Sequence, residues 1–155
     1  PSYPILNRAF GGSSLPDLIR YRYEILYPYQ PKQILIYCGE NDFAASDTVS
    51  VQTVVNRFQV LFELLRAKYK NTPVAYVSMK PSPSRPHLMP KFTAANTLIR
   101  EYLASKNKTS YVDVYNPMLN KDGTPIEDIF LEDKLHMNAK GYAIWKQRIK
   151  KVLIK

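Results

Sequence analysis

KQILIYCGEND, residues 32–42, decides the fold class, because an apolar run is followed at once by a glycine and by side chains that can do chemistry. The run is rich in β-branched and aromatic residues and almost unbroken in apolar character, which is typical of a strand buried on both faces of a sheet. Three further runs of this kind predict strands at residues 3–7, 73–79 and 110–115.

The stretches between these runs have helical spacing. Between the second and third runs, apolar residues recur at intervals of three and four, which predicts a helix over residues 48–69. Other helices are predicted at about 15–26, 90–105 and 139–154, the first of them opening on Ser14 and Asp17 in capping-box spacing. Strands that alternate with helices predict a three-layer α/β/α architecture around a parallel sheet.

Length and composition indicate one domain. A chain of 155 residues, 45% of them hydrophobic, is long enough to bury a core and too short for two such cores, so a single domain over residues 1–155 is predicted. No apolar run approaches the ~20 residues of a membrane span. The single cysteine, Cys38, excludes an internal disulfide and a cysteine-rich metal site.

The net charge of +9 favours anionic partners. The basic residues are spread along the chain, and the aromatic stretch YRYEILYPY, residues 21–29, lacks the glycine pattern of an RNA-binding sheet. No nucleic-acid partner is therefore predicted, and nucleic-acid binding is kept as the minor alternative.

Four polar clusters follow the four predicted strands. GGSS (11–14) follows the first, GEND (39–42) the second, a loop with four prolines (80–90) the third, and a stretch holding Asp133 and His136 the fourth. Ligands of such sheets bind outside the carboxyl ends of the strands. The sequence therefore predicts a shared pocket at this edge.

Asp133 and His136 have the spacing of an acid and base pair. A carboxylate three residues before a histidine can hydrogen-bond one ring nitrogen, which leaves the other as a base. Gly12, at the start of a helix, and Asn41 could supply the N–H donors that stabilise an oxyanion. The alternatives are a charged helix start for the pair, a tight turn at Gly12 and an Asx-turn at Asn41.

The proline-rich loop supplies two further candidates, Lys80 and Arg85, which could contact a polar or anionic substrate. A surface salt bridge is the alternative for Arg85. His87 in the same loop is a rival base, but no carboxylate stands three residues before it.

NRAFGGSS, GEND and DKLHMNAKGY together resemble three of the four consensus blocks of the SGNH hydrolases, the GDSL-type esterase/lipase family. The resemblance implies a flavodoxin-like fold with a parallel sheet of about five strands. It also implies a serine esterase in which His136 is the base, Asp133 orients it, and Gly12 and Asn41 form the oxyanion hole. Ala9 stands where the family usually has a glycine, so negative φ is expected there.

The block that carries the family's nucleophilic serine has no counterpart after Pro1. We therefore expect the serine and the first strand of the sheet to lie upstream of Pro1, and the given chain alone to be inactive. Serines within the chain are weaker candidates: Ser13 and Ser14 do not meet the G-x-S-x-G pattern, and Ser82 and Ser84 lack a turn that would present them to His136.

The resemblance implies hydrolysis of small-molecule, carbohydrate or lipid esters, without a metal or organic cofactor. Because no long lid or extra apolar helix is visible, short-chain or acetyl esters are preferred. The alternative function is a non-catalytic SGNH-like scaffold that binds an acylated or anionic ligand.

Overall fold

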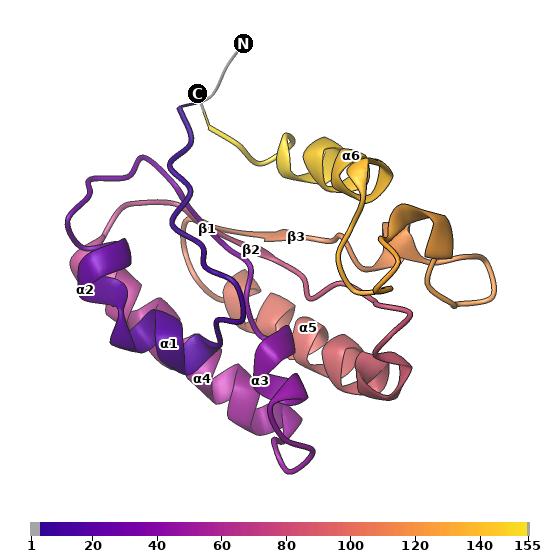
Figure 1. The fold of residues 1–155 in the computed structure, drawn as a ribbon. Coiled ribbons are helices and arrows are strands. Elements are labelled where there is room, and N and C mark those ends of the chain that lie inside the picture. Colours follow the sequence, from indigo (N-terminus) through magenta and orange to yellow (C-terminus); the bar gives the residue numbers. More distant parts are fainter. Residues whose placement is uncertain (1–3, 155) are drawn as a thin grey trace.

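The computed structural model describes residues 4–154, and a parallel sheet forms its middle layer (Figure 1). The sheet has three strands, β1 (Ile34–Ile36), β2 (Val74–Val77) and β3 (Thr109–Val112), in the order β1-β2-β3. Ile34 pairs with Val74, and Val74 pairs with Thr109. Each pair of strands is connected through a long helix, as parallel neighbours require.

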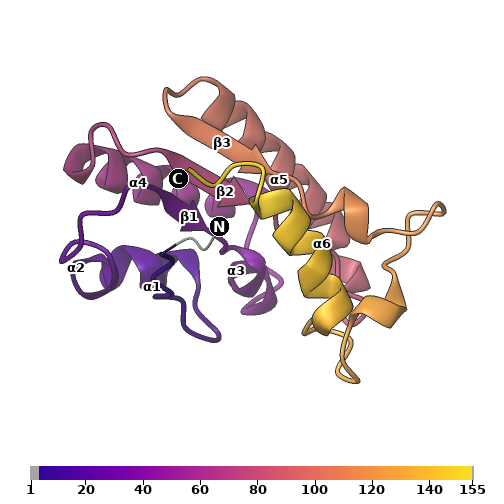
Figure 2. The ribbon, with the colours of Figure 1, turned by 90° about the horizontal axis from the view of Figure 1, so that it is seen from above.

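One face of the sheet is covered by two long helices and three short ones. They are α1 (Leu15–Arg20), α2 (Arg22–Ile25), α3 (Glu40–Ala44), α4 (Val51–Lys68) and α5 (Met89–Ala104). On the other face lies α6 (Ala139–Ile149), whose C-terminal part approaches the ends of β2 and β3 (Figure 2), where Trp145 and Ile149 pack against the strands. Single 3-10 turns lie at Pro86–Leu88, Asn116–Met118 and Glu127–Ile129.

The strands divide their side chains between two cores. Val74 and Tyr76 of β2 pack among the residues of α4 and α5. Ala75 and Val77 point to the opposite face and pack with Val112 below α6. This alternation follows from the two-residue period of a strand and explains why β2 is buried along its whole length.

The predicted α/β class is confirmed, but the strand count is wrong: of about five expected strands, four were expected within this chain, and three are present in residues 4–154. Residues 4–7 of the predicted strand 3–7 are irregular and exposed, and Tyr3 lies outside the described residues. A strand needs a neighbour for its backbone N–H and C=O groups, and these residues pair with none of the three strands. Pro4 also lacks the N–H that a ladder needs.

The helices match their predicted positions with changes at the ends. The predicted helix 15–26 is broken at Tyr21 into α1 and α2. The predicted helix 48–69 begins only at Val51, because the Ser50 hydroxyl accepts a hydrogen bond from the Thr53 N–H and caps the helix there. The last predicted helix ends at Ile149 instead of residue 154.

Phe58 anchors the larger core from the middle of α4. Its side chain is fully buried, and its ring lies 4.8 Å from that of Tyr76 on β2 at an angle of 63°. Phe58→Ala should lower the free energy of unfolding by about 3–5 kcal/mol through lost burial and the cavity that remains.

Urea unfolding monitored by circular dichroism measures this change. Val60→Ala on the same helix is the matched control, since Val60 is 50% exposed and should change stability little. Equal losses for the two variants would contradict the assignment of Phe58 to the core.

Candidate active site

Asp133 and His136 lie in a tight turn between the 3-10 turn Glu127–Ile129 and α6. Asp133 Oδ2 lies 2.5 Å from His136 Nδ1, and Asp133 Oδ1 accepts the backbone N–H groups of Leu135 and His136, each at 2.9 Å. The carboxylate thus binds both the ring and the backbone of His136. With Nδ1–H donating to Asp133, Nε2 is left to accept a proton.

Lys134 makes this turn possible. Its φ of 53° lies in the left-handed region, and its N–H donates to the Leu131 carbonyl at 2.9 Å. The turn is closed by the Leu131 N–H, which donates to the His136 carbonyl at 2.7 Å. The pair is exposed to solvent, with 70% of the His136 side chain accessible within the described structure.

The hydrogen bond from His136 lowers the pKa of Asp133 to about 2, and the N–H groups of Leu135 and His136 contribute further. Asp133 therefore stays ionised at every pH at which an imidazole titrates. It can hold an imidazolium without taking its proton.

The GEND turn follows β1 and opens α3. Gly39 has a φ of 132°, and a Cβ at this position would lie 2.9 Å from the Met79 sulfur, so both conformation and space require glycine. Asn41 donates from Nδ2 to the Ser13 carbonyl at 3.0 Å. The turn after β1 is thereby joined to the loop that carries Gly12.

Asp42 completes this junction. Its side chain is buried, Oδ2 accepts the Leu15 N–H at 2.9 Å, and Oδ1 accepts a hydrogen bond from Arg57 at 2.8 Å. One carboxylate therefore ties α3 to the start of α1 and to α4. The family resemblance implied that Asp42 holds the loop, but the sequence did not show through which partners, because they are distant in the chain.

Gly12 has a φ of 74° and open space where a side chain would lie. Among residues 4–154 its N–H donates no hydrogen bond, which leaves it available to a ligand. Ala9 has negative φ, as predicted, and its N–H is held by the Asn7 side chain at 3.0 Å. The structure thus brings Gly12 and Asn41 together through Ser13.

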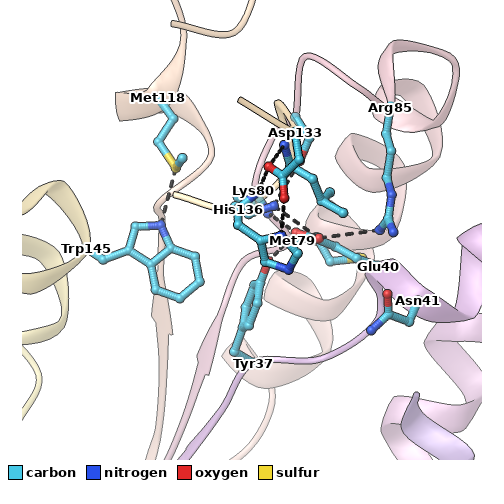
Figure 3. A network of polar contacts seen from close by, with 12 residues as sticks. Tyr37, Glu40, Asn41, Met79, Lys80, Arg85, Met118, Asp133, His136 and Trp145 are labelled. Carbon is cyan, nitrogen blue, oxygen red and sulfur yellow. Dashed lines mark hydrogen bonds and ion pairs between the residues drawn. The ribbon is translucent and has the colours of Figure 1, made fainter. Parts of the chain in front are cut away.

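A buried charged cluster that the sequence did not reveal lies at the same edge (Figure 3). Glu40 Oε2 pairs with Lys80 Nζ at 3.3 Å, and Glu40 Oε1 accepts the Lys80 N–H at 3.1 Å and the Tyr37 hydroxyl. Arg85 lies 3.8 Å from the same carboxylate. We define the Glu40 cluster as Tyr37, Glu40, Lys80, Ser82 and Arg85.

Lys80 is only 6% exposed, and its ammonium is used inside the protein on Glu40 and on the Ser82 hydroxyl at 2.9 Å. Burial lowers the pKa of Lys80, and the charge of Glu40 opposes this shift. Contact of Lys80 with a substrate stays a prediction. Its contacts with Glu40 and Ser82 indicate that Lys80 holds the loop after β2 against the start of α3.

Three of the four candidate serines, Ser13, Ser14 and Ser82, have other partners. The Ser13 hydroxyl donates to the Phe10 carbonyl at 2.8 Å, and Ser14 forms the predicted capping box with Asp17. Ser82 is fully buried against Lys80. Within residues 4–154, no serine hydroxyl hydrogen-bonds to the His136 ring.

The chain matches the sequence profile of the GDSL-like Lipase/Acylhydrolase family over residues 1–144. It belongs to this family. No curated protein sequence matches the chain. Within residues 4–154, none of the helices has the length and apolar character of a membrane span.

Solved structures share the fold of this family member at low sequence identity. A protein of Streptococcus pneumonia assigned as a platelet activating factor superimposes with a TM-score of 0.83 at 20% identity, over 96% of this chain and 72% of that one. A GDSL-like lipase of Bacteroides thetaiotaomicron gives 0.72 at 24%, over 90% and 70%. A carbohydrate esterase family 3 protein of Talaromyces cellulolyticus gives 0.74 at 16%, over 90% and 66%.

The low pKa of Asp133 can be measured directly by a carboxyl-carbon NMR titration, which should give a midpoint near 2. Because the folded-state pKa is lowered, the stabilisation that depends on it is present above the unfolded-state pKa of about 3.9 and is lost as the pH falls toward 2. His136→Ala should raise the midpoint. Asp122, whose pKa is lowered by a hydrogen bond from the Thr124 hydroxyl at 2.6 Å, is the control that His136→Ala should not shift. An unchanged Asp133 midpoint would contradict the hydrogen bond.

Proposed function

We propose that the protein is a serine-type carboxylic ester hydrolase that acts through an acyl-enzyme. The observation that carries the proposal is the Asp133–His136 pair, oriented with Nε2 free, in a member of an acylhydrolase family. Asp133 fixes the ring and stabilises the imidazolium, and His136 takes the proton of the nucleophile and returns it to the leaving alcohol.

The oxyanion hole in this proposal is formed by the Gly12 N–H and the Asn41 amide. Two observations support this oxyanion hole. The Gly12 N–H donates no hydrogen bond within residues 4–154, and Asn41 is held next to the Gly12 loop by its bond to the Ser13 carbonyl. These donors would stabilise the negative charge that develops on the carbonyl oxygen in the transition state.

The nucleophile is proposed to be a serine upstream of Pro1. The order of the family's motifs supports this assignment, as does the engagement of Ser13, Ser14 and Ser82 with other partners. The 155-residue chain alone is then expected to be inactive, and the activity measurements below use the full-length protein.

Short-chain or acetyl esters are the proposed substrates. Family membership supports ester hydrolysis, and the fold is shared with a carbohydrate esterase. A carbohydrate ester is therefore one candidate for the alcohol part of the substrate.

A non-catalytic scaffold that binds an acylated or anionic ligand is the second candidate. Within the described residues His136 contacts no serine hydroxyl, which fits a scaffold without a nucleophile as well as a hydrolase whose serine lies upstream. Hydrolysis of p-nitrophenyl acetate by the full-length protein decides between the two candidates, since a scaffold would leave the ester intact.

His136→Ala should reduce kcat for p-nitrophenyl acetate by about 10³-fold or more, because the general base is lost. The matched control is His87→Ala, which removes the other histidine of the chain and should leave kcat within about twofold. If both variants retain the wild-type rate, the proposed acid and base pair is wrong.

Asn41→Ala tests the oxyanion hole separately. Loss of one donor should lower kcat by about 10²- to 10³-fold while KM changes little, because the bond strengthens only in the transition state. Asn71→Ala is the control, since the Asn71 amide contacts the Lys108 ammonium at 2.9 Å away from the site. A change confined to KM would exclude Asn41 as an oxyanion donor.

A further inference from the structure

Arg85 is a cation without a hydrogen-bond acceptor. Its side chain is 19% exposed, yet among residues 4–154 its guanidinium donates no hydrogen bond. Its nearest anion is Glu40 at 3.8 Å, beyond hydrogen-bonding distance. A guanidinium has five N–H donors, and among the described residues only Arg22 Nε is a buried side-chain nitrogen without a partner. The Arg85 donors therefore face solvent, where a ligand can reach them.

Glu40 does not satisfy Arg85, because the nearer carboxylate oxygen lies 3.8 Å from the guanidinium and already faces the Lys80 ammonium. Oε1 accepts the Lys80 N–H and the Tyr37 hydroxyl, and Oε2 faces the Lys80 ammonium. One carboxylate is therefore shared by two cations. Lys80 is the buried one of the two, so the surplus positive charge lies at Arg85.

The other carboxylates of the site are also engaged. Asp42 binds Arg57 and the Leu15 N–H, and both oxygens of Asp133 are used by His136 and its turn. The charge of Asp133 reaches Lys80, where it opposes the effect of burial on the pKa, but no ion pair joins it to Arg85 within the described residues.

Arg85 also lies at the proposed active site. Its guanidinium points toward Glu40, the residue directly before the proposed oxyanion donor Asn41 (Figure 3). Arg85 comes from the loop after β2, whereas Glu40 and Asn41 begin α3 after β1. The unpaired donors of Arg85 therefore belong to the same sheet edge as the reacting groups.

We propose that Arg85 binds a carboxylate on the substrate, so that the preferred substrates are short-chain esters of acidic alcohols. The inference rests on the proposed ester hydrolase. Because the acyl group is expected to be small, the negative charge is assigned to the alcohol part. A planar carboxylate can accept two parallel N–H donors from a guanidinium, which an amide of the same shape cannot match.

Two pairs of acetate esters test the preference: 3- and 4-acetoxybenzoate against 3- and 4-acetoxybenzamide. Each pair differs at one substituent, a charged carboxylate against a neutral carboxamide of similar shape. The full-length protein should give a kcat/KM for the better benzoate about tenfold or more above that for its amide, as expected of hydrogen bonds to a charged group. Arg85→Met should remove most of this ratio, and Arg85→Lys should restore part of it. Equal ratios in the wild type and Arg85→Met would overturn the subsite.

Arg148→Met is the matched control. Arg148 is an exposed arginine of α6, and its loss lowers the net charge by the same amount. The benzoate to benzamide ratio should stay within about twofold of the wild type. An equal fall in both arginine variants would mean that net charge alone attracts the anion, which also overturns the subsite.

A benzoate-binding measurement distinguishes failure of the anion subsite from failure of the proposed ester hydrolase. Benzoate, titrated into the protein, should shift the Nε–H signal of Arg85 in ¹⁵N NMR spectra, whereas benzamide should not. Benzoate should also shift the side-chain amide signal of Asn41, and this second shift should disappear in Arg85→Met. Benzoate binding without hydrolysis of any ester supports the anion subsite and overturns the hydrolase. Hydrolysis with neither benzoate binding nor a charge preference overturns the subsite alone.

Discussion

The buried carboxylate of Asp42 holds together the elements on which the site depends. It accepts the first N–H of α1 and a hydrogen bond from Arg57 on α4, while it stands in the first turn of α3. A carboxylate in this position is stabilised by its charged partner and by the N–H groups at helix starts. Without it, the glycine loop would be joined to the turn after β1 chiefly by the Asn41 hydrogen bond to the Ser13 carbonyl, since the loop residues 8–12 are exposed.

A second buried carboxylate, Glu40, stands two residues earlier and faces the opposite way. Asp42 binds within the layer of α1 and α4, whereas Glu40 binds Lys80 at the end of β2. Burying such charges is costly unless they are paired, and pairing only repays that cost when the geometry is good. The residues on both sides of Asn41 are therefore fixed by buried carboxylates. This holds the Asn41 backbone in place, as a preorganised hydrogen-bond donor requires.

The degree to which the sequence could predict this arrangement differs from residue to residue. Asp133 and His136 were found because their contact is local, three residues apart, and their turn is built from its own backbone. The convergence of GGSS and GEND was predicted from the rule that parallel strands present their carboxyl ends at one edge. The strand expected before GGSS does not form in residues 4–7, and hydrogen bonds to Asn41 and Asp42 bring the two segments together instead. The role of Glu40 was missed, because a glutamate after a glycine is usually solvated and only the position of Lys80 buries it.

The sequence by itself determined the alternation of strands and helices, the α/β class and the spacing of the acid and base, because these depend on hydrophobic period and on neighbours in the chain. Only the tertiary structure decided which charges are satisfied. Lys80 and Arg85 are five residues apart in one polar loop and look alike in sequence, yet one is neutralised by Glu40 and the other is left without an acceptor. That difference arises from the approach of residues forty positions apart, which no local pattern encodes.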